Sequence, residues 1–401
     1  MAEKNWELSV LSELADKGWE LTNGSGIQAD TTYEERVRAT RVPDSILPNY
    51  KAFRHGRESR ESLIIPGEVK EALRRLNPDA TEDHVQKAYT TLTRRRSTNA
   101  MAENKEALGY MSAGIPVEMK APDGTLRTRN LQVISADPAQ NTYLAAQQVT
   151  VVSGGRSYRL DVVLYCNGLP VGIIELKDQD KKLTEAYNQM NTYQREIPQA
   201  FIYNIVTIMG QADHARYGTI GTPLSHTAQW NYNAEGAETP NGTYHDDNGQ
   251  HSTPLNRIIQ AFGTPEILLD MMRHFTLFVG TGSEEGSKSY VKILAKAHQY
   301  YAVREALDRA VKTHTGRGQV GVVWHTQGSG KSYSMLFFAR AAMREKALHN
   351  PTIVVVTDRT DLDSQLYTTF LNAKDMLPEE PVQFDSRREL KNRLNDIQSG
   401  G

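Results

Sequence analysis

Three residues near the middle of the chain have the types and spacing needed for metal-dependent cleavage of a phosphodiester. Asp161 lies in one apolar run, and Glu175 and Lys177 end a second, two residues apart and therefore on one side of a strand. The two runs flank Asn167-Gly168, a strong local signal for a β-hairpin. Mg²⁺ prefers oxygen ligands, and a lysine can neutralise charge that develops on the phosphate. The sequence predicts a Mg²⁺ site with Asp161 and Glu175 as ligands and Lys177 as a third catalytic residue.

The length of the hairpin loop decides whether these side chains can meet. With a regular two-residue Asn167-Gly168 loop, Asp161 faces Ile174, so Glu175 points to the opposite side of the sheet. A shift of one residue reverses this parity. We therefore predict a three- or five-residue loop or a bulge in one strand, with Gly168 at positive φ. The alternative is an ordinary solvated acid–lysine pair at a strand end.

A glycine-rich segment further along the chain could bind a nucleotide. An apolar run of strand type, 319–324, leads into the loop 325–330 and then into a helix expected to continue to about residue 346. Backbone N–H groups of such a loop cradle phosphates, while the lysine neutralises them and the serine contacts Mg²⁺. The residues expected to do this are Gly328, Ser329, Gly330, Lys331 and Ser332. A further strand is expected at 352–357, and the alternative for the loop is a structural turn.

Composition limits the classes of protein to which the chain can belong. The 401 residues are long enough for two or three domains, and the net charge of −2 means that any nucleic-acid contact must come from local basic clusters. Arg94-Arg95-Arg96 is one such cluster, although a solvated helix face is the alternative. The single cysteine, Cys166, excludes an intrachain disulfide and is expected to be buried. With no signal-peptide or membrane-spanning run in the sequence, we expect a soluble, cytoplasmic protein.

The hydrophobic periodicity predicts an α/β chain. The expected helices span residues 7–17, 68–76, 82–92, 102–114, 183–197, 255–272 and 290–312. The expected strands outside the hairpin and the nucleotide-loop region span 131–134, 143–152 and 201–209, and residues 232–254 are expected to form a solvated loop.

These motifs resemble the R subunit of type I restriction-modification enzymes. Asp161, Glu175 and Lys177 look like the centre of the PD-(D/E)xK nucleases, and Gln189 with Tyr193 looks like the QxxxY motif of RecB-like members, which would support the active site or the DNA. Nucleases of this kind often add a glutamate from an early helix. The residues considered for that role are Glu103 and Glu106.

The C-terminal part resembles the beginning of the same family's motor. The segments that carry this resemblance are 298–303, 324–332 and 357–365, with Gln299 in the position of an adenine-reading glutamine. The resemblance implies a PD-(D/E)xK nuclease domain over residues 1–255, with its core at about 100–230. It also implies the first part of a RecA-like superfamily-two domain over 256–401, truncated before motif II.

The resemblance also implies the function of the whole protein. The expected activity is a Mg²⁺-dependent, ATP-dependent endonuclease that cleaves unmodified foreign duplex DNA after ATP-driven translocation, with methylation and specificity subunits as partners. Because the chain stops before motif II, we expect an N-terminal fragment that is not itself a competent ATPase. The alternatives are a RecB-like repair helicase–exonuclease and a non-catalytic DNA-binding scaffold.

Overall fold

The computed structural model describes residues 3–40, 49–120, 124–233, 235–245, 249, 251–281, 289–316, 318–358, 360–377 and 379–396. The chain divides into two compact units, Met1–Arg273 and His274–Gly401. The two helices within residues 254–273, which the prediction placed almost entirely in the second domain, belong to the first unit. Among the described residues, no helix is long and apolar enough to cross a bilayer.

A six-stranded mixed sheet forms the centre of the first unit. Its strands, in spatial order, are β1 (Glu20–Asn23), β4 (Tyr143–Ser153), β5 (Arg156–Cys166), β6 (Leu169–Leu176), β7 (Val206–Gly210) and β8 (Arg216–Gly218). β4, β5 and β6 are antiparallel neighbours, whereas β1 runs parallel to β4 and β7 parallel to β6. Every residue of β6 is buried, which is the pattern of a strand covered on both faces.

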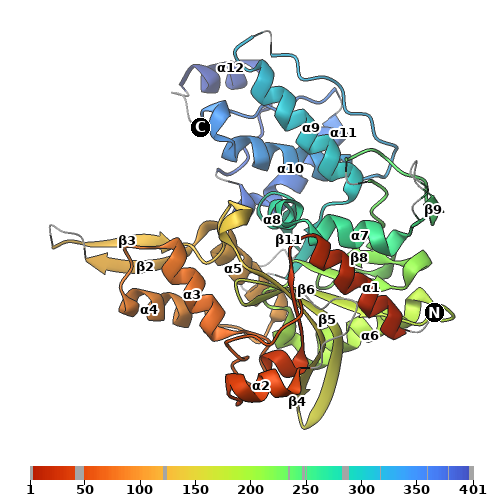
Figure 1. Cartoon of the computed structure of the whole chain (residues 1–401). Helices are drawn as coiled ribbons and strands as arrows, with labels where there is room; N and C mark the ends of the chain where they lie inside the picture. The colour runs from red at the N-terminus through yellow and green to blue at the C-terminus, as the bar shows by residue number, and fades with distance from the viewer. Residues whose placement is uncertain are drawn as a thin grey trace. The chain divides into compact units, whose positions relative to one another are not determined.

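Eight helices in the described part of the first unit surround this sheet (Figure 1). They are α1 (Glu3–Asp16), α2 (Tyr33–Ala39), α3 (Pro66–Leu76), α4 (Glu82–Thr93), α5 (Ala100–Ala113), α6 (Leu183–Glu196), α7 (Pro254–Gly263) and α8 (Pro265–Arg273). Capping boxes at Thr32, Thr81 and Thr253 satisfy N–H groups in the first turns of α2, α4 and α7. α6 packs against β6 and β7, and its buried Ala186 and Met190 belong to the hydrophobic core that includes Val163 and Ile173.

Several elements of the first unit, among them β1, α2, β2 (Ile115–Lys120) and β8, were not predicted, and two of the predicted strands differ in the structure. Residues 131–134 were expected to form a strand, but the structure has a separate hairpin of β2 and β3 (Leu126–Leu131), and the strand ends at Leu131. The expected strand 201–209 begins at Val206, because Pro198–Phe201 forms a 3₁₀ turn. The predicted loop at 232–254 includes only the two-residue strands β9 (Tyr244–His245) and β10 (His251–Ser252) in its described part. Cys166 is buried, as predicted.

The second unit contains a two-stranded sheet and four helices within its described residues. These are β11 (Thr276–Gly280), β12 (Tyr290–Leu294), α9 (Ala297–Thr313), α10 (Lys331–Arg344), α11 (Thr360–Asn372) and α12 (Arg387–Asp396). The helix predicted over 290–312 therefore begins only at Ala297, and the residues before it pair with β11 instead. α9 and α10 pack against each other.

The strands predicted at 319–324 and 352–357 are not strands in the structure. Val322 is 94% exposed and Trp324 80% exposed, and Val356 in the second segment is 83% exposed. A strand needs a hydrogen-bonding neighbour, and among the described residues β11 and β12 pair only with each other. The prediction of two buried strands is therefore wrong for this structure, because an apolar run does not show whether a neighbouring strand is available to pair with it.

Candidate functional site

The hairpin that joins β5 and β6 contains the predicted irregularity. Cys166 pairs with Leu169 across a two-residue turn, in which Asn167 and Gly168 both have positive φ. The register then shifts, so that Leu164 pairs with Gly172. One extra residue, Val171, lies between the two registers on β6, which is a β-bulge. The prediction of a bulge is confirmed, and the new register puts Asp161 opposite Glu175 and on the same side of the sheet.

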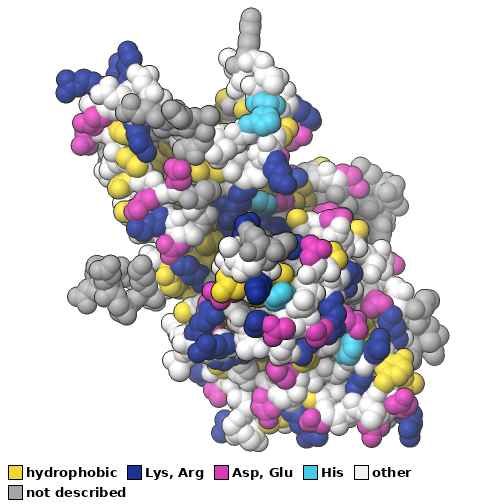
Figure 2. Space-filling view, turned by 90° about the vertical axis from the view of Figure 1, so that its left-hand side faces the viewer, with side chains coloured by type: hydrophobic (Ala, Val, Ile, Leu, Met, Phe, Trp, Pro, Cys, Tyr) yellow, Lys and Arg dark blue, Asp and Glu magenta, His cyan; other side chains and the backbone are white. Residues whose placement is uncertain are grey.

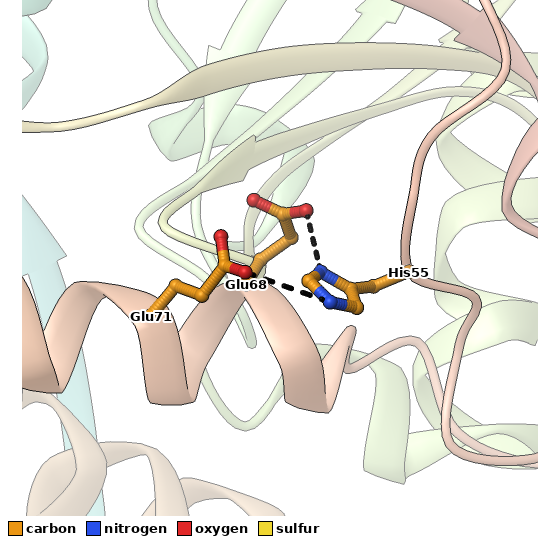
Figure 3. Close-up of side chains that lie close together, drawn as sticks. All are labelled: His55, Glu68 and Glu71. Atoms are coloured by element: carbon orange, nitrogen blue, oxygen red, sulfur yellow. Dashed lines mark hydrogen bonds and ion pairs between the residues drawn. The ribbon is translucent and has the colours of Figure 1, made fainter.

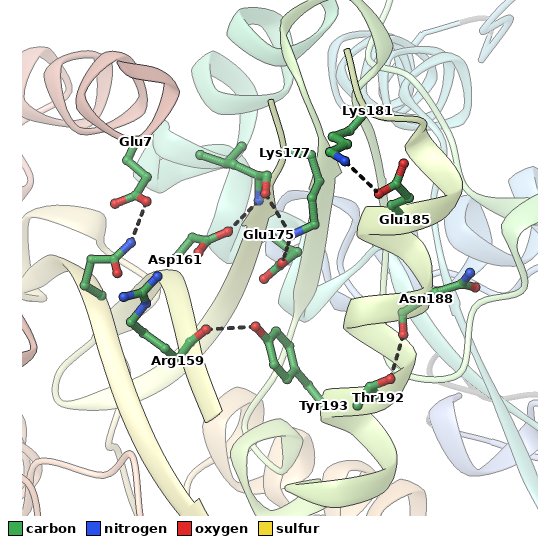
Figure 4. Close-up of polar contacts among 12 residues, drawn as sticks. Glu7, Arg159, Asp161, Glu175, Lys177, Lys181, Glu185, Asn188, Thr192 and Tyr193 are labelled. Atoms are coloured by element: carbon green, nitrogen blue, oxygen red, sulfur yellow. Dashed lines mark hydrogen bonds and ion pairs between the residues drawn. The ribbon is translucent and has the colours of Figure 1, made fainter. Parts of the chain in front are cut away.

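Asp161, Glu175 and Lys177 come together at the end of the hairpin (Figure 4). The Lys177 Nζ forms an ion pair with Glu175 Oε1 and also donates to the Leu176 carbonyl at 3.1 Å. The Leu176 N–H donates to Asp161 Oδ2 at 2.8 Å. Asp161 is 4% exposed and Glu175 2% exposed, so both carboxylates are withdrawn from bulk water.

The electrostatics of the pair favour a cation beside it. Burial and the charge of Asp161 together raise the pKa of Glu175 to about 8, while Lys177 and the nearby Tyr193 hydroxyl oppose the rise. Glu175 Oε2 is buried and has no hydrogen-bond partner among the described residues. An orphaned carboxylate oxygen next to a second carboxylate is a costly arrangement unless a positive charge compensates it. These two oxygen-donor side chains therefore fit a hard divalent cation such as Mg²⁺.

Tyr193 and Gln189 lie on α6, which covers this end of the sheet (Figure 4). The Tyr193 hydroxyl donates to the Arg159 carbonyl of β5 at 2.8 Å. Burial and the negative charge of Glu175 raise the pKa of Tyr193, and a hydrogen bond from the neighbouring Gln189 opposes this rise. The structure thus brings Tyr193 to the strand that carries Asp161, two residues away, with Gln189 beside it.

The two early-helix glutamates considered for the site make other contacts. Glu103 on α5 accepts the N–H groups of Arg96 at 2.8 Å and Ser97 at 2.6 Å, and Glu106 forms an ion pair with Arg96. They therefore stabilise the segment that follows α4. Arg94 is the C-cap of that helix, so Arg94, Arg95 and Arg96 do not form the solvated helix face that was the alternative interpretation. Neither glutamate makes a described contact with Asp161 or Glu175.

A different glutamate, Glu7 on α1, contacts the strand next to β5 (Figure 4). Glu7 is 4% exposed and accepts a hydrogen bond from the Gln148 side chain. Gln148 lies opposite Asp161 on β4, between the pairs 147–162 and 149–160, and has the unusual φ of +53°. Strained backbone conformations of this kind concentrate at functional sites. No local pattern could reveal Glu7, because its approach depends on the packing of α1 against β4 and β6.

A second polar cluster was not predicted. Among the described residues, one group of three His, Cys, Asp or Glu side chains has converging ligand atoms: His55, Glu68 and Glu71 (Figure 3). His55 Nδ1 lies 3.1 Å from Glu68 Oε1, and its Nε2 lies 3.6 Å from Glu71 Oε1. The two glutamates are three residues apart on α3, which was the available sequence signal. The contacts of the histidine with both carboxylates explain the cluster without a ligand.

In the second unit, the predicted nucleotide loop precedes α10. Gly328 and Gly330 both have positive φ, and α10 starts at Lys331 with Ser332 in its first turn. Lys331 Nζ donates to the His325 carbonyl at 2.8 Å. Gln299, at the start of α9, donates to the Gly330 carbonyl at 3.0 Å. The structure therefore brings the six predicted nucleotide-binding residues, including Ser329, to one helix N-terminus.

Comparisons with known proteins agree with this division of the chain. The model of the "Type I restriction enzyme R protein N terminus" matches residues 1–226, and that of the "SWI2/SNF2 ATPase" matches residues 298–400. The Haemophilus influenzae type I restriction enzyme HindI endonuclease subunit is 33% identical over 346 residues, which cover 84% of this chain and 32% of the relative. A putative type I restriction enzyme endonuclease subunit of Methanocaldococcus jannaschii, MjaIXP, is 29% identical over 337 residues, which cover 78% and 31%.

The chain spans about a third of the length of these curated relatives. The R-protein match covers more than half of the chain and includes Asp161, Glu175 and Lys177 on the bulged hairpin. This chain belongs to the family of type I restriction enzyme R proteins and corresponds to their N-terminal region.

Proposed function

We propose that the first unit is a Mg²⁺-dependent nuclease of the PD-(D/E)xK type and that it cleaves duplex DNA. The observation that carries this proposal is the bulge at Val171, which turns Glu175 and Lys177 to the side of Asp161. The bulge interrupts the regular pairing of β5 and β6, and its effect is to place the three side chains on one side of the sheet. The order of three antiparallel strands, a helix and a parallel strand from β4 to β7 also supports this fold class.

Each residue of the centre has a distinct role under this proposal. Asp161 and Glu175 hold the cation through carboxylate oxygens, and Lys177 places an ammonium beside the attacked phosphate to neutralise its developing charge. Bound Mg²⁺ supplies a water of lowered pKa and Lewis acidity at the phosphate. Tyr193 fixes β5 through the Arg159 carbonyl, and Gln189 steadies the tyrosine.

The second unit is proposed to supply part of an ATP-driven translocase. The supporting observations are the SWI2/SNF2 ATPase match and the glycine loop at the N-terminus of α10. The relatives are endonuclease subunits of type I enzymes, and we propose that this protein likewise acts with methylation and specificity subunits on unmodified DNA. In the face shown in Figure 2, Lys and Arg side chains are interspersed with Asp and Glu, so DNA contacts are expected from local basic clusters.

The test compares Asp161→Asn, Glu175→Gln and Lys177→Ala in the complete R protein, assembled with its methylation and specificity subunits. We expect cleavage of unmodified plasmid in Mg²⁺ to fall at least about 100-fold, because each change removes charge stabilisation at the phosphate. ATP hydrolysis should stay within about twofold, since Lys331 and its loop are unchanged. Glu185→Gln, which alters an exposed acid on α6, is the matched control. Wild-type cleavage by any of the three variants would support a non-catalytic scaffold instead.

A further inference from the structure

Two consecutive residues at the start of α9 bind two consecutive carbonyl groups of the glycine loop. His298 Nε2 lies 3.1 Å from the Ser329 carbonyl oxygen, so this nitrogen carries the proton and donates it. Gln299 Nε2 donates to the Gly330 carbonyl at 3.0 Å. The matched spacing means that the helix start holds the loop at two adjacent peptide groups.

The side-chain amide of Gln299 is engaged at both ends within the protein. Its Oε1 accepts the N–H of Lys296 at 2.9 Å, which caps α9, and its Nε2 contacts the loop. Gln299 is 4% exposed. A Cβ on Gly330 would lie 2.8 Å from Gln299 Nε2, so the loop position must be glycine for the glutamine to approach. Both polar atoms of the Gln299 side chain are therefore bonded within the protein and are not directed at the base of a nucleotide.

The geometry of a trans peptide converts these contacts into an orientation of the donors on the loop. The carbonyl of one residue and the N–H of the next point in opposite directions from a planar peptide group. Holding the Ser329 carbonyl therefore fixes the direction of the Gly330 N–H, and holding the Gly330 carbonyl fixes that of the Lys331 N–H. The Gly330 carbonyl also accepts the N–H groups of Tyr333 and Ser334, which ties the same peptide to α10.

We propose that His298 and Gln299 are positioning residues that aim the Gly330 and Lys331 N–H groups at the triphosphate of a bound nucleotide, whichever base it carries. The inference rests on the proposed nucleotide binding and assigns Gln299 a different role from that of an adenine reader. His325 belongs to the same set of contacts around the loop. Its ring lies edge-on to the His298 ring, with centroids 5.0 Å apart, and its carbonyl accepts a hydrogen bond from the Lys331 side chain.

Equilibrium binding to the 401-residue chain tests this role, with ATP, GTP and inorganic tripolyphosphate as probes in the presence of Mg²⁺. Gln299→Ala and His298→Ala should weaken all three probes by the same factor, about three- to tenfold, because each removes one hydrogen bond that preorganises the loop. Gln299→Glu keeps the acceptor that caps α9 but replaces the donor to Gly330 with a negatively charged oxygen, so it should weaken all three probes at least as much as Gln299→Ala while leaving the helix capped. His314→Ala, at the exposed end of α9, is the matched control, and unfolding curves verify that each variant is folded.

The pattern across probes decides the outcome. Equal losses for ATP, GTP and tripolyphosphate support the positioning role. A loss confined to ATP, with tripolyphosphate unaffected, would show that Gln299 contacts adenine and would overturn the inference while leaving nucleotide binding intact. Unchanged binding of all probes would overturn it as well. If the wild-type chain binds none of the probes although Lys331 is present, nucleotide binding itself is wrong for this chain and the inference fails with it.

Discussion

At the scale of single residues, the carboxyl group of Glu13 makes the stability of the first unit depend on pH. Burial and, to a smaller extent, the charge of Asp16 raise its pKa to about 8, while Lys17 opposes the rise. Glu13 Oε1 accepts from Asn256 on α7, whereas its buried Oε2 has no hydrogen-bond partner among the described residues. The folded state thus keeps a proton that the unfolded chain releases above its ordinary value of 4.5. The stability that this proton contributes is fully present below that pH and is lost as the pH rises through about 8.

We predict that Glu13→Gln removes this loss. Relative to wild type, the variant should gain roughly 2–4 kcal/mol in the free energy of unfolding between pH 5 and pH 9, because an amide cannot ionise in the buried position. Urea unfolding at pH 5, 7 and 9 measures the difference. Glu118→Gln, which alters an exposed acid on β2 and keeps Glu13, should lose stability with rising pH as the wild type does. Parallel wild-type and Glu13→Gln curves over this range would contradict the assignment.

The sequence was sufficient to predict that Asp161, Glu175 and Lys177 come together, because all three belong to one local hairpin. The contact of Glu7 with Gln148, opposite Asp161, could not be predicted, since it depends on the packing of a helix more than a hundred residues away in the chain. Glu103 and Glu106 were reasonable by residue type, but the structure engages both with the segment around Arg96. Residue type suggests a ligand, and only tertiary packing decides which glutamate reaches it.

At the scale of elements, the turn of the hairpin that carries Asp161 and Glu175 packs against the start of α3. Gly168 has a φ of +79°, and its carbonyl accepts the N–H of Ile65 at 3.0 Å. A Cβ at this position would lie 2.7 Å from both the Glu68 Cβ and the Ile65 carbonyl oxygen. Gly154, in the turn between β4 and β5, also has positive φ but would find nothing within 4 Å of an added Cβ.

The two glycines therefore form a matched pair for mutation. Gly154→Ala should cost about 1 kcal/mol in the free energy of unfolding, for the backbone conformation alone. Gly168→Ala should cost roughly 3 kcal/mol, because a steric clash with backbone atoms adds to the same conformational penalty. Chemical denaturation of both variants provides the comparison. Equal costs would mean that the hairpin turn is not held against α3 as the structure shows.

The hairpin also shows which features of an element can be predicted. Side chains alternate along a strand, so a site shared by Asp161 and Glu175 required a change of register, and the bulge was predictable on that ground. Its location at Val171 was not, because the choice of the bulged residue depends on packing on both faces of β6. The strand predictions at 319–324 and 352–357 were wrong for a related reason, since an apolar pattern does not reveal whether a neighbouring strand is present.

At the scale of the whole molecule, the chain contains two units with separate sites. The proposed nuclease centre lies in Met1–Arg273 and the glycine loop in His274–Gly401. The predicted nuclease and motor domains were based on the order of the two motifs along the chain, which does not define a boundary between them. α7 and α8 belong with the first unit because α7 packs against α1 and β8, contacts that are distant in sequence.

The central claim, that Asp161 and Glu175 share a divalent cation, is tested most directly by anomalous diffraction from crystals of this chain soaked in Mn²⁺ as a substitute for Mg²⁺. We predict an anomalous peak bonded to carboxylate oxygens of Asp161 and Glu175, with Lys177 beside it, and loss of that peak in Glu175→Gln. A peak confined to His55, Glu68 and Glu71, or no peak between two ordered carboxylates at Asp161 and Glu175, would contradict the account.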